Sequence, residues 1–172
     1  MYRKIKADTI FDGYRFLPGN KVLICNAAGS VEAIVDDADA GDDIAIIEGM
    51  LSPGFINTHC HIELSHLKGK IPEHTGLVNF VQQVMSGRES SAPEQILAMQ
   101  QAADELYESG TVAIGDICNT ADSIALKRHS HLHWHNFIEL SGFVDAGAVK
   151  RFEAACVLAE AFNELSSVTT LT

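Results

Sequence analysis

Two histidines in the stretch LSPGFINTHCHIELSHLKG, residues 51–69, are the side chains best placed to bind a metal ion. His59 and His61 are separated by one residue, and they follow the short apolar run at residues 54–57. In an extended backbone, residues two apart point to the same face, so both imidazoles should point one way and Cys60 the other. Imidazole nitrogens about 2.0–2.1 Å from one cation are ordinary zinc ligands. The pair therefore predicts part of a metal site.

A second group of histidines lies in HSHLHWH at residues 129–135. The four members of this run are His129, His131, His133 and His135. The run precedes the apolar stretch NFIEL, so it lies where a strand begins. In parallel α/β folds the chemistry lies at the carboxyl ends of the strands, and the amino ends serve stability. We therefore interpret this run as a polar connection and favour the first pair as the metal site.

The kind of secondary structure that the sequence predicts changes near residue 50. Before it, short apolar runs are separated by turn residues, which predicts a small β layer. After it, strands alternate with helices, which indicates parallel βαβ units. The predicted strands cover residues 54–58, 111–117, 134–143 and 167–171, and the predicted helices cover residues 76–87, 91–110, 120–129 and 148–165. Ser91 and Glu94 have the spacing of a capping box at the start of the second helix.

Composition narrows the class of protein. The 172 residues are 47% hydrophobic and 20% charged, which is typical of a chain that buries a core. The formal net charge of −11 argues against nucleic acid and anionic membrane as partners. No stretch has the length of a membrane-spanning helix, and the start MYRKIKADTIFDG has no apolar signal core, so we expect a cytoplasmic protein. The four cysteines form no C-x-x-C pair, and we expect reduced thiols.

The number of strand–helix units predicts an incomplete barrel. We count three complete units and the start of a fourth, whereas a (β/α)8 barrel needs eight units and about 250 residues. An open half-barrel would leave sheet edges and apolar faces uncovered. We therefore expect residues 51–172 to be the first strands and helices of such a barrel.

The stretch at residues 51–69 resembles the first-strand signature of the amidohydrolase superfamily, P-G-F-[IV]-[ND]-x-H-x-H. The stretches ADTIFDGYRFLPGNKVLI, LYESGTVAIGDICN and HNFIELSGF are similar to the lead-in and to the next two barrel strands of that superfamily, so the resemblance covers essentially the whole chain. Glu63, in HCHIEL, is typical of its cytosine deaminase, chlorohydrolase and aminofutalosine deaminase branch.

The resemblance implies an α/β fold class: the amino-terminal half of a (β/α)8 TIM barrel, preceded at residues 1–50 by part of a small β-sandwich. It implies one divalent metal, zinc first and iron as the alternative, held by His59 and His61 together with ligands beyond Thr172. The catalytic acid–base glutamate should also lie beyond Thr172. We therefore expect a small-molecule substrate for the parent enzyme and no activity for the 172 residues alone. A homodimer is left open.

Several other polar residues have two interpretations each. Glu63 is a substrate contact or a solvated loop carboxylate, and His66 in the same loop should be exposed. Asp116 and Asn119 end the second barrel strand and either line the site or cap the next helix, with capping favoured for Asn119. Glu139 lies inside an apolar strand, so it is either an inward site residue that binds substrate or a buried partner for a cation.

Three functions fit these observations. The first is the amino-terminal portion of a metal-dependent hydrolase that deaminates a ring amidine, such as a nucleoside or a related heterocycle, which the glutamate in HCHIE favours. The second is a cyclic amide or imide hydrolase of the same superfamily, with two metals and a carboxylated lysine beyond this chain. The third is a truncated, non-catalytic fragment or a scaffold that pairs with another chain.

Overall fold

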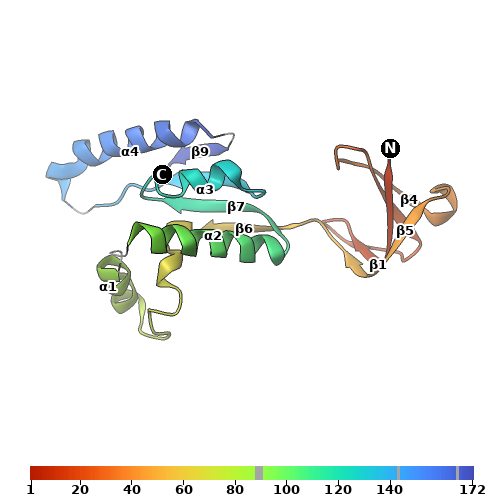
Figure 1. Ribbon diagram of the computed structural model, residues 1–172, viewed down its shortest axis with the longest axis horizontal. Coiled ribbons are helices and arrows are strands. Elements are labelled where there is room, and N and C mark those ends of the chain that lie inside the picture. Colours follow the sequence, from red (N-terminus) through yellow and green to blue (C-terminus); the bar gives the residue numbers. More distant parts are fainter. Residues whose placement is uncertain (88–90, 143, 166) are drawn as a thin grey trace. The chain divides into compact units, whose positions relative to one another are not determined.

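A computed structural model describes residues 1–87, 91–142, 144–165 and 167–172 of the chain. They form two compact units, Met1–Pro53 and Gly54–Thr172 (Figure 1). No helix among the described residues is both long and apolar enough to cross a membrane.

The first unit is a five-stranded sheet. Its strands are β1 (Arg3–Phe11), β2 (Phe16–Leu17), β3 (Lys21–Cys25), β4 (Val31–Asp36) and β5 (Ile44–Leu51), with a short 3-10 helix, η1 (Asp37–Asp39). Strand β1 pairs antiparallel with β2 and β3 and parallel with β5. Ala7, Ile10 and Val22 are buried in this unit. The predicted small β layer is confirmed, and a β-sandwich stays a prediction.

The second unit is a parallel sheet with its strands in chain order. Its elements are β6 (Phe55–Cys60), η2 (Ile62–Leu67), α1 (Leu77–Gly87), α2 (Ala92–Glu108), β7 (Thr111–Cys118), α3 (Ile124–His129), β8 (His133–Ile138), η3 (Asp145–Gly147), α4 (Ala148–Asn163) and β9 (Val168–Leu171). Each of the strands β6, β7, β8 and β9 pairs in parallel with the next. The alternation of strands and helices predicted from the sequence is confirmed.

Helices cover one face of this sheet. Ile114 of β7 and Trp134 of β8 pack with Met99 and Ala103 of α2. Further along the same strands, Cys118 and Ile138 pack with Ala155 and Phe162 of α4. Both clusters use the same alternate residues of β7 and β8, because residues two apart in a strand share a face. The sheet is therefore buried on the helix side.

The opposite face of the sheet is open. It carries Ala113 and Gly115 of β7 opposite His133 and His135 of β8, and it forms a groove of about 280 Å³. A methyl group on Gly115 would lie 2.9 Å from the Thr58 carbonyl oxygen, so only glycine allows β6 and β7 to approach this closely.

Three local expectations differ from the structure. Helix α2 begins after Ser91 as predicted, but no side-chain cap bond forms there, and Glu94 instead pairs with Lys70 at 2.8 Å. Helix α3 begins only at Ile124. Strand β8 ends at Ile138 rather than continuing to residue 143, which lies outside the described residues.

Candidate metal centre at the end of strand β6

A β-bulge near the end of β6 orients the two histidines. Asn57 pairs with Ile114, and Cys60 pairs with Asp116, so β6 has one residue more than β7 over this interval. The extra residue shifts the alternation of side chains, and Cys60 packs against the helix-side core. His59 and His61 flank Cys60, so their rings lie on the open side, with ring centres 5.3 Å apart. The structure therefore brings the two histidines together at the carboxyl end of β6.

The spacing of the two rings suits a shared cation. With a metal–nitrogen distance of about 2.1 Å, one ion can contact two imidazoles whose centres are roughly 5–6 Å apart. Cys60 packs on the helix side of the sheet, away from the two rings, and burial, and then the Asp116 carboxylate, raise the pKa of its thiol from 9.0 to about 12. A thiol binds metal as the thiolate, which this environment disfavours at neutral pH. The available donors are therefore two imidazoles.

His61 has one nitrogen that is short of a partner. Its Nδ1 is buried and makes no hydrogen bond with the described residues. A buried polar atom of this kind is stabilised when a cation or a donor reaches it. Over the described parts of the chain, no group of three or more histidine, cysteine, aspartate or glutamate side chains is arranged to hold a metal. The two histidines thus fit the first positions of a site that needs about three protein ligands.

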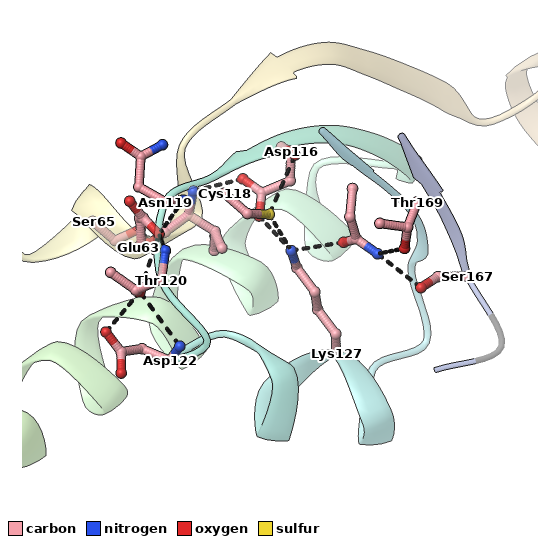
Figure 2. Close-up of polar contacts among 12 residues, drawn as sticks. Glu63, Ser65, Asp116, Cys118, Asn119, Thr120, Asp122, Lys127, Ser167 and Thr169 are labelled. Atoms are coloured by element: carbon pink, nitrogen blue, oxygen red, sulfur yellow. Dashed lines mark hydrogen bonds and ion pairs between the residues drawn. The ribbon is translucent and has the colours of Figure 1, made fainter. Parts of the chain in front are cut away.

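Glu63 ties the segment after β6 to the loop after β7. One carboxylate oxygen, Oε2, accepts hydrogen bonds from the backbone N–H groups of Asn119 and Thr120, both at 3.0 Å (Figure 2). The Thr120 hydroxyl lies 3.2 Å from the same oxygen and makes a shorter contact, 2.7 Å, with Asp122 Oδ2. The Glu63 side chain is buried. The solvated-carboxylate interpretation is therefore wrong, and any substrate contact would have to use the other oxygen, Oε1. The substrate-binding role of Glu63 stays a prediction.

Asn119 and Glu139 meet at the same edge of the sheet. The Asn119 side-chain amide donates to Glu139 Oε2 at 2.9 Å. Asn119 does not cap α3, because Ser123 precedes the first residue of that helix. Glu139 follows the last residue of β8 and is exposed, so the expectation of a carboxylate within the strand, buried against a cation, is wrong. Its substrate-binding role stays a prediction.

His66 is buried, contrary to expectation. Its Nδ1 lies 3.2 Å from the Glu63 carbonyl oxygen. Helix α2 packs over η2, and this packing, which the loop sequence does not reveal, removes His66 from solvent.

The histidine run begins at the amino end of the strands, as predicted, but it continues into strand β8. His129 ends α3 and His133 begins β8. His135 stacks on Phe137, and its Nε2 lies 2.9 Å from the Thr170 hydroxyl. The interpretation of the run as a polar connection therefore holds only for His131, because His129 belongs to α3 and both His133 and His135 belong to strand β8.

A buried ion pair beneath the site was not predicted from the sequence. Asp116 and Lys127 contact each other at 2.6 Å, and their side chains are 1% and 0% exposed. The signal was present in the sequence, because Asp116 and Asn136 occupy positions of their strands that alternate with apolar neighbours and share the helix-facing side. A charged residue at such a position requires a buried partner.

The chain is similar in fold to several solved enzyme structures. The chain is similar to Helicobacter pylori aminofutalosine deaminase in complex with methylthio-coformycin, with a TM-score of 0.73 and 21% identity over 98% of this chain and 43% of that one. It is similar to the guanine deaminase of C. acetobutylicum with bound guanine, with a TM-score of 0.65 and 13% identity over 100% and 46% of the two chains. It is also similar to atrazine chlorohydrolase from Arthrobacter aurescens TC1 complexed with zinc, with a TM-score of 0.65 and 17% identity over 98% and 45%.

The three neighbours show the fold of this chain, because each matches at least 98% of its residues. The predicted resemblance to the amidohydrolase superfamily is confirmed at the level of the fold, since these identities are all below 25%. The chain spans less than half the length of each of these neighbours. No protein-family model matches the chain, and a comparison with curated proteins finds no match.

Proposed function

We propose that this chain carries the first two metal ligands of a hydrolase that deaminates a ring amidine in a nucleoside or related heterocycle. The observation that carries the proposal is the pair His59 and His61, which lies at the carboxyl end of β6 with ring centres 5.3 Å apart. The carboxyl ends of strands are where barrel enzymes carry out chemistry. The fold neighbours that are hydrolytic deaminases favour this reaction class.

The roles proposed for the metal ion and for individual residues follow from the side chains that the described residues provide. A divalent cation, zinc first and iron as the alternative, would supply a water acidic enough to react at neutral pH. His59 and His61 would bind this cation. The third ligand and the proton-transfer group are expected outside these 172 residues, since the chain spans less than half the length of its fold neighbours. Glu63, in the segment after β6, and Glu139, just after β8, would contact the polar edge of the substrate.

Metal binding by the chain itself is the first test. Zinc would be titrated into metal-free protein by calorimetry, while NMR follows the ring carbons of the histidines. We expect a saturable site that shifts the His59 and His61 resonances together and is lost in His59→Ala and His61→Ala. His131→Ala removes an imidazole at the opposite end of the strands, so it is the matched control. Binding that survives His59→Ala but is lost in His131→Ala would contradict the proposal.

The reaction is tested in the parent enzyme. Metal-loaded protein would be assayed for ammonia release from aminated purine and pyrimidine nucleosides, with His59→Ala as the inactive variant. Release of ammonia that persists unchanged in His59→Ala would refute the assignment of this histidine to the reaction.

A further inference from the structure

A buried lysine forms the centre of a polar network between the sheet and its helices. Lys127 of α3 donates hydrogen bonds to Asp116 Oδ2 at 2.6 Å, Asn136 Oδ1 at 2.9 Å and Cys118 Sγ at 3.2 Å (Figure 2). An ammonium group has three N–H donors, so these partners satisfy it completely. The Lys127 Nζ also lies 5.0 Å from the ring centre of Trp134 and 4.8 Å from that of Phe162, within the range of cation–π attraction. The lysine is therefore held in one place.

Asp116 connects this lysine to the metal-binding strand. Its second oxygen, Oδ1, accepts the backbone N–H of Ile62 at 2.8 Å. Ile62 follows His61 and lies beyond the last residue of β6, where the strand ladder no longer provides a partner for that N–H. A charged acceptor that is itself fixed by an ammonium group gives a short, well-oriented bond. The peptide bond between His61 and Ile62 is therefore held by a side chain of the neighbouring strand.

The network continues along the sheet to its last strand, β9. The Asn136 side-chain amide donates to the Ser167 hydroxyl at 2.8 Å, and the Val168 carbonyl and Thr169 hydroxyl oxygens lie at 3.4 Å (Figure 2). Asn136 is fully buried. The same group of contacts thus links the end of β6, through β7 and β8, to the start of β9.

We infer that Asp116 is a positioning residue for the metal-binding pair, acting on His61 through the Ile62 amide, and that Lys127 orients its carboxylate. This inference rests on the proposed metal-binding role of His59 and His61. Outer-shell partners that orient a ligand typically change metal affinity about 10- to 100-fold when they are replaced. Asp116 acts through the backbone rather than through an imidazole, so its effect should appear as a displaced His61 and not as a lost ligand.

Asp116→Asn is the informative variant, because it keeps the size of the side chain while removing the charge that Lys127 orients. In metal-free protein we expect faster hydrogen exchange of the Ile62 amide and a shift of the His61 ring resonances. With zinc we expect affinity about 10- to 100-fold below that of the original chain. If this variant does not fold, Asp116→Asn combined with Lys127→Met removes both buried charges together, and the same changes are expected in it.

Ser167→Ala is the matched control, since it removes a partner at the far end of the same network. It should leave the His61 resonances and the zinc affinity unchanged. A folded Asp116→Asn protein with normal Ile62 exchange and His61 shifts would overturn the inference, as would equal zinc affinity in both variants. Failure of the original chain to bind zinc through His59 and His61 would refute the proposed function instead, and the metal-free measurements would still decide the role of Asp116.

Discussion

Replacing Lys127 with methionine should destabilise the second unit by about 3–5 kcal/mol, because it leaves a buried charge without its partner. Methionine keeps the apolar stem of the lysine but provides no donor for Asp116, whose side chain is 1% exposed. The ammonium makes three hydrogen bonds, at 2.6, 2.9 and 3.2 Å. One hydrogen bond to a charged group contributes about 1.5–3 kcal/mol, so losing the bond to Asp116 at 2.6 Å supplies a large share of the expected magnitude.

The paired variant separates the charge effect from packing. Asp116→Asn together with Lys127→Met removes both charges, and replacement of a whole buried pair by neutral residues is often close to neutral. We therefore expect the double variant to be more stable than Lys127→Met alone by roughly 2–3 kcal/mol. If the two substitutions acted independently, their losses of stability would add, and the double variant would be less stable than Lys127→Met. A double variant that is more stable therefore shows that the two charges interact.

Urea unfolding followed by tryptophan fluorescence measures these differences. Trp134 is the only tryptophan of the chain, and its ring centre lies 5.0 Å from Lys127 Nζ, so the signal reports the second unit and its buried network. Each variant would be fitted with its own baselines at constant salt. A loss below about 1 kcal/mol in Lys127→Met, or a double variant that is less stable than the single one, would refute the stabilising role of a buried, paired ammonium.

Two further predictions concern the ends of the strands and the thiols of Cys60 and Cys118, which pack against the core. Glu63→Gln should lower the free energy of unfolding by about 1–2 kcal/mol and speed hydrogen exchange of the two loop amides bound to it, because Oε2 accepts both backbone N–H groups. Glu139→Gln, at an exposed carboxylate, is the control, and equal losses in both variants would contradict the anchoring role of Glu63. Stability should also fall as pH rises above 9, because burial raises the pKa of the Cys60 and Cys118 thiols from 9.0 to about 12, so that the unfolded chain releases these protons first. Urea titrations between about pH 8 and 10 should show a weaker pH dependence in a Cys60→Ala, Cys118→Ala variant, and an unchanged dependence would show that the two thiols are not its cause.

The order of strands and helices could be predicted from the sequence because it follows the spacing of apolar residues. Helix α1 (Leu77–Gly87) and strand β7 (Thr111–Cys118) lie within one residue of their expected bounds. The side-chain roles of polar residues were harder to predict, because they depend on partners distant in sequence. Glu63 is anchored by amides more than fifty positions away, and Asn119 donates to a carboxylate twenty positions away. Local rules of capping and exposure do not include such partners.

The orientation of the histidine pair also could not be predicted from local sequence rules, because it depends on a β-bulge. Alternation counted along β6 from Ile56, which shares a face with Ala113, would place Cys60 on the open side and both histidines against the helices. The bulge between Asn57 and Cys60 reverses this. No glycine or proline marks the bulge in the sequence, and it is defined by pairing with β7, a strand more than fifty residues later. Asp116 pairs with Cys60 in that register and binds the Ile62 amide just beyond it, so the residue that stabilises the shifted register also holds the end of the histidine pair. The orientation of the candidate metal ligands is therefore a property of two strands, and the second of them contributes no ligand.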